Sequence, residues 1–433
     1  MSVRAWLRSF FFRLGTADTA NAGWESRSCP ADAKVAGVAA AEAVPAPPDE
    51  RCDAASLPAA EEHRTENPPA WLSPTPWTVA KNAGSGATLR LVVPAPEPIP
   101  FSHPRVYGRE SLPPLDIPIA DPTSIPQLSV VDVSNVLALP SHVLIQQEVG
   151  LLPQSFMRGR KEHHAGLKRM KKQFRLRRWR DLSQHDRLET PAYFSDTDYP
   201  ATYGHVLMEA LPRLWAFDRV DPDRTVVSGV ALTPSYVKML TCLNVNLERY
   251  VHLKHPLLCD RLLIPSVPVV RREYIHPVAW ETFARLGTLA EQSSCPVAER
   301  IYLSRSRAAG RELRNEAEIE QIFADRGFLI VHPQDLAIED QVRLFANARL
   351  IAGSGGSAMH NAVFARPDAR VLIVSVEEWV PKLDMMINRV PGQLGYVFGE
   401  YLPRSRPARP WWRKPWHVDA ALVEYAIREH FDL

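Results

Sequence analysis

The sequence predicts an α/β protein in which two α/β units follow a long N-terminal segment. Apolar runs typical of strands alternate with segments of helical periodicity, first over residues 128–266 and again from residue 301. Between Leu350 and Val374 the order is strand, glycine-rich turn, helix and strand, as in a nucleotide-binding half-unit. The length of 433 residues and the hydrophobic content of 45% allow about two to three domains with buried cores.

The first 114 residues are predicted to have little fixed structure. The chain holds 39 prolines, about 9% of its residues against a usual ~5%, and many of them lie in this segment. Runs such as AVPAPPDE and VVPAPEPIP are typical of linkers. The opening VRAWLRSFFFRLG is either a short amphipathic helix at a membrane face or a ragged terminus, since no apolar run approaches the ~20 residues that span a bilayer.

The net charge of +2 and the five scattered cysteines indicate the expected surroundings of the protein. The charge balance gives no general attraction to nucleic acid, and no nucleic acid is expected as a partner. The cysteines form no CxxC pair and have no spacing that suits zinc, which favours a reducing, cytoplasmic compartment. The basic stretch Arg158–Arg180 is either a solvated helix or flexible insert, or a contact for an anionic acceptor or the inner membrane face.

The first α/β unit is assigned to residues 115–286. Leu128–Gln147 predicts two strands joined by a turn at Pro140–Ser141. Residues 202–220 predict a helix, because apolar side chains recur at helical spacing, and Pro212 is expected to bend it. The next expected elements are a strand at Arg224–Leu232, a helix at Ser235–Asn244, and strands at Arg249–Leu253 and Arg261–Ser266.

The second α/β unit is assigned to residues 287–400, and a tail to residues 401–433. Asn315 and Glu318 are spaced as a capping box at the start of its first helix. The other expected elements are strands at Ile301–Arg305, Phe328–Val331 and Arg370–Val374, a strand beginning at Leu350, and a helix at Ile338–Ala348. In the tail, Val418–Phe431 predicts an amphipathic helix with Ala421, Leu422, Tyr425 and Ala426 on its apolar face.

The glycine-rich turn after the strand at Leu350 is the first candidate site. It contains Ser354, Gly355, Gly356 and Ser357, small residues placed where a strand gives way to a helix. Glycines let the backbone pass close to a phosphate, and the free N–H groups and positive end of a helix favour a diphosphate there. A tight turn without any ligand would use the same residue types.

Two stretches of the chain resemble family 61 glycosyltransferases. HVLMEALPRLWAF, at His205–Phe217, is similar to the HWLLExLPRL signature of that family. The C-terminal signature of the family is matched in order by IYLSR, RELRNE, a helix bearing Gln341, and the glycine-rich turn that ends in Asn361. The resemblance covers roughly residues 116–400.

The resemblance implies a GT-B architecture, in which two Rossmann-like domains face each other across a cleft and the second holds the donor. It implies inverting transfer from a nucleotide sugar, here a UDP-sugar, to a glycan or lipid-linked acceptor in cell-surface polysaccharide synthesis. It implies no metal or other cofactor. Many members carry His-Gly-Ala-Gly where this chain has Gly355-Gly356-Ser357-Ala358, which implies a shift in the donor contacts.

Inverting transfer needs a base on the acceptor hydroxyl, and the helix over residues 202–220 offers two candidates. His205 is the first choice, because an unperturbed imidazole titrates near neutral pH. Glu209 lies four residues on, on the same helix face, where it orients His205 or is itself the base. Arg213 is expected to support this face, and the structural alternative for Glu209 is an ion pair with Arg213. The residues expected to be buried behind the face are Leu207, Leu211 and Leu214.

The nucleotide-sugar donor is assigned to the second unit. Arg305, at the end of a strand, is suited to grip the diphosphate. Asn315 is either a ligand contact or a helix cap, Asn361 is preferred to His360 for holding the turn, and Glu377 is suited to a ribose hydroxyl. The motif Asp196-Thr197-Asp198 resembles a metal-binding DxD, but it is interpreted as a turn because no predicted strand leads into it.

Two other classes of function stay open from the sequence. Gly353-x-Gly355-x-x-Ala358 fits the loose dinucleotide fingerprint of an oxidoreductase, with Glu377 near the expected distance, although little sequence follows for a full dinucleotide fold. The altered glycine-rich turn also suits a non-catalytic relative that binds a sugar or polymer.

Overall fold

The computed structural model describes residues 87–97, 103–109, 125–140, 142–146, 150–152, 185–271, 273–308, 310, 312–376, 380–402 and 414–433. All of them belong to one compact unit, Asn67–Leu433. The predictions for residues 1–86, for the basic stretch Arg158–Arg180 and for Glu377 lie outside the described residues.

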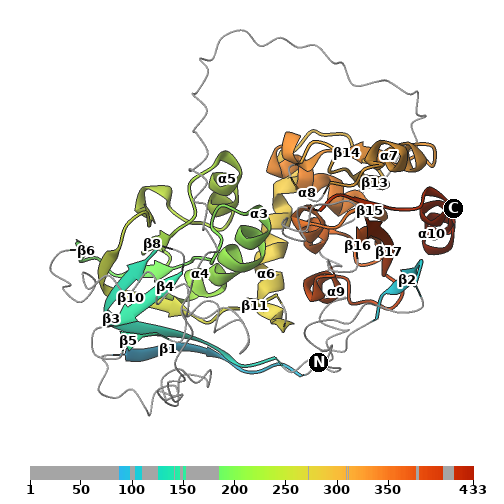
Figure 1. The fold of residues 1–433 in the computed structure, drawn as a ribbon. Helices are drawn as coiled ribbons and strands as arrows, with labels where there is room; N and C mark the ends of the chain where they lie inside the picture. Colours follow the sequence, from blue (N-terminus) through green and yellow to red (C-terminus); the bar gives the residue numbers. More distant parts are fainter. Residues whose placement is uncertain are drawn as a thin grey trace, which may run out of the picture. The chain divides into compact units, whose positions relative to one another are not determined.

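The first sheet is mixed and has nine strands (Figure 1). Its order is β5 (Gly150–Leu151), β4 (Val143–Gln146), β3 (Leu128–Leu139), β10 (Leu257–Pro265), β7 (Ala192–Phe194), β8 (Thr225–Ser228) and β9 (Tyr250–His252). Strands β10, β7, β8 and β9 run parallel, whereas β3, β4 and β5 pair antiparallel. Two further strands pair off this path: β1 (Ala87–Val93) is antiparallel to β3, and β6 (Asp186–Leu188) is parallel to β10. The expected Rossmann-like character therefore applies to the parallel half alone.

The connection from β7 to β8 is the helical segment that the sequence predicts over residues 202–220. It changes hydrogen-bonding pattern along its length, from α3 (Tyr203–His205) to the π-helical η6 (Val206–Ala210), the 3-10 helix η7 (Leu211–Ala216) and α4 (Phe217–Val220). Pro212 lies in the first turn of η7, and the missing N–H of proline explains why the regular α pattern is not kept. Helix α5 (Pro234–Cys242) then leads from β8 to β9, which completes a βαβαβ unit.

The second sheet is parallel over five consecutive strands, in the order β14 (Leu329–Val331), β13 (Arg300–Leu303), β15 (Leu350–Ser354), β16 (Arg370–Val376) and β17 (Leu394–Tyr401). At its edge, β18 (Trp416–His417) pairs antiparallel with β17, and β2 (Arg105–Tyr107) pairs parallel with it. This sheet confirms the predicted parallel α/β unit.

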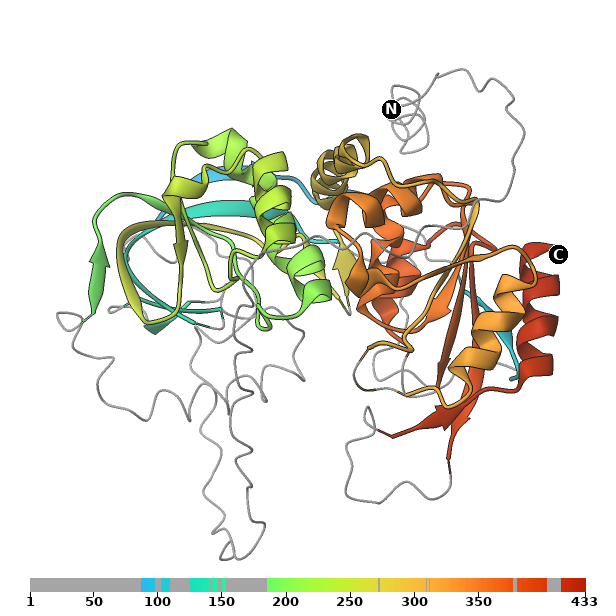
Figure 2. The same cartoon turned by 90° about the horizontal axis from the view of Figure 1, so that it is seen from above.

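Helices cover both faces of the second sheet. Figure 2 shows α7 (Glu316–Ala324) and α10 (Ala420–Phe431) side by side, and their apolar residues share one cluster with Tyr302 and Leu372 of the sheet. The opposite-facing residues Ile301 and Val371 belong to a second cluster with α8 (Ile338–Asn347) and the 3-10 helix η11 (Ser357–Phe364). This alternation is the period of two that a strand buried on both faces requires.

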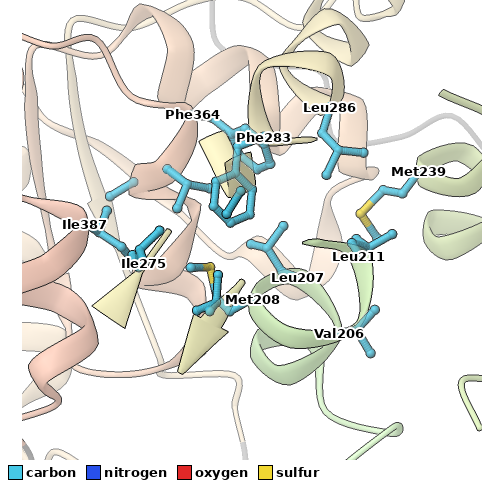
Figure 3. Close-up of a cluster of buried hydrophobic side chains, with 14 of the residues drawn as sticks. Val206, Leu207, Met208, Leu211, Met239, Ile275, Phe283, Leu286, Phe364 and Ile387 are labelled. Atoms are coloured by element: carbon cyan, nitrogen blue, oxygen red, sulfur yellow. The ribbon is translucent and has the colours of Figure 1, made fainter. Parts of the chain in front are cut away.

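The second cluster continues into the first half of the protein. It includes α6 (Pro277–Gly287), which with η9 (Thr288–Gln292) follows the hairpin β11 (Val269–Val270) and β12 (Tyr274–Ile275). Figure 3 shows Leu207 and Leu211 of the 203–220 segment near Phe283 of α6. Leu207, Leu211 and Leu214 are 0%, 0% and 3% exposed, so their predicted burial is confirmed.

The expectation of little fixed structure before residue 115 is wrong where that segment is described. Ala87–Val93 forms β1 and pairs with β3, and Arg105–Tyr107 forms β2 and pairs with β17. The prolines around these strands favoured a linker in the prediction, but proline is tolerated beside short edge strands. The expected face of the C-terminal helix is confirmed for Ala426, which is buried, but wrong for Tyr425, which is 46% exposed. The other buried residues of α10 include Val423, Ile427 and His430.

Candidate active site

The first group of candidate residues lies at the carboxyl edge of the first sheet. The chain passes from β7 to β8 and β9 on one side, whereas β10 lies parallel to β7 on the other. In α/β sheets, ligands bind beyond the carboxyl ends of the two strands between which the order reverses, here β7 and β10. Asp196 and Thr197 follow β7 directly, and the chain after β10 leads to Arg271 in the β11–β12 turn. The sequence interpretation that no strand leads into Asp196-Thr197-Asp198 is therefore wrong, because the three-residue strand β7 was missed.

His205 and Glu209 make the contact that their spacing predicts. The Nδ1 atom of His205 lies 2.9 Å from Oε2 of Glu209, and their side chains are 13% and 4% exposed. Thr197 Oγ1 donates to the same Oε2 at 2.5 Å, and Arg271 Nε donates to the other oxygen, Oε1, at 2.5 Å. The ring of Tyr199 packs against the imidazole, with ring centroids 4.6 Å apart. The carboxylate thus has partners on both oxygens, and the imidazole is held at one nitrogen and one face.

The carboxyl of Glu209 is an ionised group at neutral pH. Burial alone would raise its pKa, but the hydrogen bond from His205, the charge of Arg271 and the hydroxyl of Thr197 outweigh burial and lower the pKa to about 2. A carboxylate with so low a pKa has little tendency to accept a proton. Of the two roles that the sequence leaves open, orienting His205 therefore suits Glu209 better than acting as the base.

Arg213 lies behind this pair rather than bonded to it. Its side chain is fully buried, its Nη2 lies 2.8 Å from Nε2 of His142, and its guanidinium lies 5.7 Å from the Phe194 ring centre. Among the described residues it forms no ion pair with Glu209; that place belongs to Arg271. Burial lowers the pKa of Arg213 to about 10 and raises that of the buried Asp196 carboxyl to about 7.

The second group lies at the carboxyl edge of the second sheet, between β13 and β15. The chain leaves β13 toward β14 on one side and returns to β15 on the other, so this is the reversal point of the second sheet. Gly353 of β15 lies so close to β13 that a Cβ atom there would be 2.7 Å from Cβ of Leu303. A glycine is thus required for the two strands to approach where the turn begins.

Glu316, the first residue of α7, occupies the space between these strand ends. It is 6% exposed and accepts hydrogen bonds from the Tyr302 hydroxyl at 2.9 Å and the Arg305 backbone N–H at 3.2 Å. The Ser354 hydroxyl also donates to it, at 3.2 and 3.3 Å to the two oxygens. Burial raises the pKa of the Glu316 carboxyl despite these donors. Ser354, predicted to face a phosphate, is thus engaged with a neighbouring side chain.

Arg305 and Asn315 are placed differently from each other. Arg305 follows β13, is partly buried, and contacts the Gly310 carbonyl through Nη2 at 3.4 Å; burial lowers its pKa. Asn315 stands at the helix cap position but makes no side-chain cap bond. Its amide instead donates to the Val418 carbonyl and to Glu318, both at 2.9 Å. The predicted capping interaction is therefore wrong, and Asn315 links the C-terminal segment to the start of α7 by hydrogen bonds to Val418.

The glycine-rich turn itself has the predicted course from strand to helix. The Gly355 N–H donates to the Val374 carbonyl at 2.8 Å, Gly356 is extended, and η11 begins at Ser357. Asn361 is fully buried; its Nδ2 donates to Oε1 of Gln341 at 2.9 Å, and its Oδ1 accepts from the Tyr203 hydroxyl. Asn361 thus links the turn both to α8 and to the helical segment of the first half.

The two candidate groups meet at Gly204. A Cβ atom on Gly204 would lie 2.7 Å from Nδ1 of His360 and 2.8 Å from Oγ of Ser357. Only a residue without a side chain lets the start of the helical segment lie so close to η11. His205, the candidate base, is therefore the next residue after a point of contact with the glycine-rich turn.

Five residues of these groups had no site role predicted from the sequence: Thr197, Tyr203, Arg271, Glu316 and Gln341. Tyr203 and Thr197 flank the signature that begins at His205, and Gln341 and Glu316 lie inside the quoted C-terminal stretches. Their positions beside or inside these motifs could have indicated that these four residues belong to the site. Arg271 is far from any motif, and nothing in the sequence indicated that it reaches Glu209.

Within the described ranges, no three His, Cys, Asp or Glu side chains are grouped so that they could hold a metal ion. In the same ranges, no helix has the length and apolar character needed to cross a membrane.

Comparison with known proteins identifies the part of the chain that contains most residues of both groups. The family model described as Glycosyltransferase 61 matches residues 203–372. These residues are a glycosyltransferase 61 domain. The domain begins at Tyr203, ends inside β16, and includes His205, Glu209, Arg271, Arg305 and the glycine-rich turn. The comparison with curated proteins found no match.

A glycosyltransferase 61 domain indicates an enzyme of the glycosyltransferase class, which acts on a sugar donor and an acceptor. It agrees with the resemblance seen in the sequence and weighs against a dinucleotide-binding oxidoreductase.

Proposed function

We propose that this glycosyltransferase inverts the anomeric centre and acts without a metal. Its substrate would be a UDP-sugar, and its acceptor a hydroxyl of a glycan or lipid-linked saccharide in cell-surface polysaccharide synthesis. In this proposal the two sheets are the lobes of a GT-B enzyme, residues 115–286 carry the acceptor side and residues 287–400 carry the donor side. The supporting observation is the contact between Gly204 and the glycine-rich turn, which brings a histidine–carboxylate pair next to a phosphate-type turn.

His205 is the proposed base. Its Nδ1–H donates to Glu209, which leaves the other ring nitrogen able to accept a proton. That nitrogen takes the proton of the acceptor hydroxyl while the hydroxyl oxygen attacks the anomeric carbon. The bond from the anomeric carbon to the diphosphate oxygen breaks, and its electron pair leaves with the nucleoside diphosphate. The imidazolium that forms is stabilised by the charge of Glu209.

Arg305 and the turn are proposed to hold the nucleoside diphosphate. The guanidinium offsets the charge that develops on the leaving group, and the N–H groups at the start of η11 favour the phosphates. A carboxylate between β13 and β15 repels phosphate but accepts hydrogen bonds from hydroxyl groups. Glu316 is therefore a candidate for a ribose hydroxyl, the role that the sequence assigned to Glu377.

A donor screen tests the proposal. The purified full-length chain would be incubated with a panel of UDP-, GDP-, CMP- and dTDP-sugars, and release of the nucleotide would be followed by mass spectrometry. We expect slow hydrolysis of at least one UDP-sugar, abolished by His205→Asn. Binding of a UDP-sugar without any turnover would favour the non-catalytic relative, and an increase in Tm with NADH but not with UDP would favour the oxidoreductase.

A further inference from the structure

Arg271 reaches the candidate base pair from an element that no sequence motif contains. It lies in the turn between β11 and β12, and its side chain is 29% exposed. Its Nε atom lies 2.5 Å from Oε1 of Glu209, whose side chain is 4% exposed. A hairpin after β10 thus delivers a positive charge to a carboxylate on the helical segment after β7.

The two oxygens of Glu209 face different partners. Oε2 faces His205 and Thr197, whereas Oε1 faces Arg271. The guanidinium is charged at every pH at which the enzyme works. Because the carboxylate is shared, Arg271 offsets part of the negative charge that would otherwise favour a proton on the imidazole.

We propose that Arg271 is a positioning residue for the His205 base: by pairing with Oε1 of Glu209, it offsets part of the charge that the carboxylate presents to the imidazole and leaves Oε2 to fix the orientation of the ring. This inference rests on the proposed function in its assignment of His205 as the base. A carboxylate without such a partner would hold the imidazole in place but would also favour the imidazolium, which cannot accept a proton.

Other charged and titratable groups surround the pair, and Arg271 stands out among them by direct contact. On the same helical segment lies Arg213, which interacts electrostatically with Glu209 but is bonded to His142. The groups on neighbouring elements are Asp196, Asp198 and Tyr199 after β7, Tyr274 of β12, and His360 of η11 beside Gly204. Replacing Arg271 therefore changes the charge next to Glu209 and leaves these neighbours in place.

An NMR titration tests the inference without requiring turnover. The protein would carry ¹³C-labelled histidine, and the His205 resonance would be assigned by its loss in His205→Asn. We expect Arg271→Gln to move the titration midpoint of His205 to a pH about one unit higher, as removal of a nearby positive charge requires. Arg271→Lys, which keeps the charge, should restore most of the wild-type midpoint.

Arg219→Gln is the matched control, because Arg219 also pairs with a glutamate, Glu281, at 2.5 Å, but both side chains are 42% exposed. It should leave the His205 midpoint unchanged. An unchanged midpoint in Arg271→Gln, or the same change in Arg271→Lys, would overturn the inference.

The pH dependence of UDP-sugar hydrolysis separates this result from the proposed function. In Arg271→Gln, the acid limb of kcat/KM should move to higher pH by the same amount as the NMR midpoint. A lower rate at all pH values, with an unmoved acid limb, would indicate a purely structural role for Arg271 and would contradict the inference. Absence of turnover in the wild-type enzyme with every sugar would count against the proposed function, while the NMR result would still decide the electrostatic coupling.

Discussion

At the scale of single residues, the carboxylate of Glu209 organises the candidate base. It joins Thr197, from the chain after β7, to Arg271, from the hairpin after β10, and both contacts converge on a side chain that is 4% exposed. A buried carboxylate with partners on both oxygens has one orientation, and it fixes the imidazole that it contacts. Orienting the imidazole in this way does not require the carboxylate to accept a proton.

Replacing Glu209 with Gln should separate orientation from base chemistry. We expect turnover to fall by about 10²-fold or more, since general base catalysis contributes about 10²–10⁴-fold. The acid limb of kcat/KM should move to lower pH, opposite to Arg271→Gln, because the charge that favours the imidazolium is lost. Initial rates over pH 5–9, with UDP-sugar as substrate, check both effects.

The exposed Glu281 provides the control for this experiment, since Glu281→Gln removes a carboxylate whose side chain is 42% exposed. That variant should keep wild-type rates and an unmoved acid limb. Near-normal turnover in Glu209→Gln would contradict the role assigned to the carboxylate.

At the scale of secondary-structure elements, α10 shows how the end of the chain is tied to the second sheet. His430 in its last turn is fully buried, and its Nε2 lies 3.0 Å from the Val371 carbonyl. Burial lowers the pKa of His430 to about 4. Between that pH and about 6.5 the unfolded chain binds a proton that the folded chain does not, so stability falls as the pH falls.

The variant His430→Asn should therefore be less sensitive to acid than the wild type. From the pKa of about 4 in the folded state, the loss of unfolding free energy between pH 7 and pH 4.5 should shrink by about 2 kcal/mol. Urea unfolding at the two pH values measures this difference. His417→Asn, at an exposed position of β18, is the control and should behave as the wild type. An equal loss in His430→Asn and wild type would contradict the assignment.

Elements with strong periodicity could be predicted from the sequence, and short ones could not. The strands β13, β14, β15 and β16 and the helices α7 and α8 lie where apolar runs and helical spacing placed them. The three-residue strands β2 and β7 give no periodic signal, and their pairing partners are distant in sequence. In α10 the residue types indicated a helix, but the buried face depends on the sheet that it packs against.

The candidate site could be predicted in part for the same reason. His205 and Glu209 are four residues apart on one segment, so their contact follows from local geometry. The pairing of Arg271 with Glu209 spans 62 residues, and Ser354 with Glu316 spans 38. Contacts between residues so far apart in sequence are set by the tertiary fold. For this reason the sequence predicted Arg213 as the partner of Glu209, and a phosphate as the partner of the Ser354 hydroxyl.

At the scale of the whole molecule, the proposed function assigns the base and the nucleotide site to two different parts of one glycosyltransferase domain. In the proposed function, the helical segment that begins at Tyr203 supplies the base, and the strand ends of the second sheet hold the nucleotide. The two parts touch where Tyr203 donates to Asn361 and where Gly204 packs against η11. A donor bound at the turn would thus lie beside the proposed base, which is not among the residues proposed to hold the nucleotide.

Calorimetric titration of UDP into three forms of the enzyme tests this division most directly. Wild type and His205→Asn should bind UDP with the same Kd, although His205→Asn should have lost turnover. Arg305→Ala should bind UDP at least about 10-fold more weakly, since it loses a charge-assisted contact to phosphate. Unchanged UDP affinity in Arg305→Ala, together with lost affinity in His205→Asn, would contradict the account.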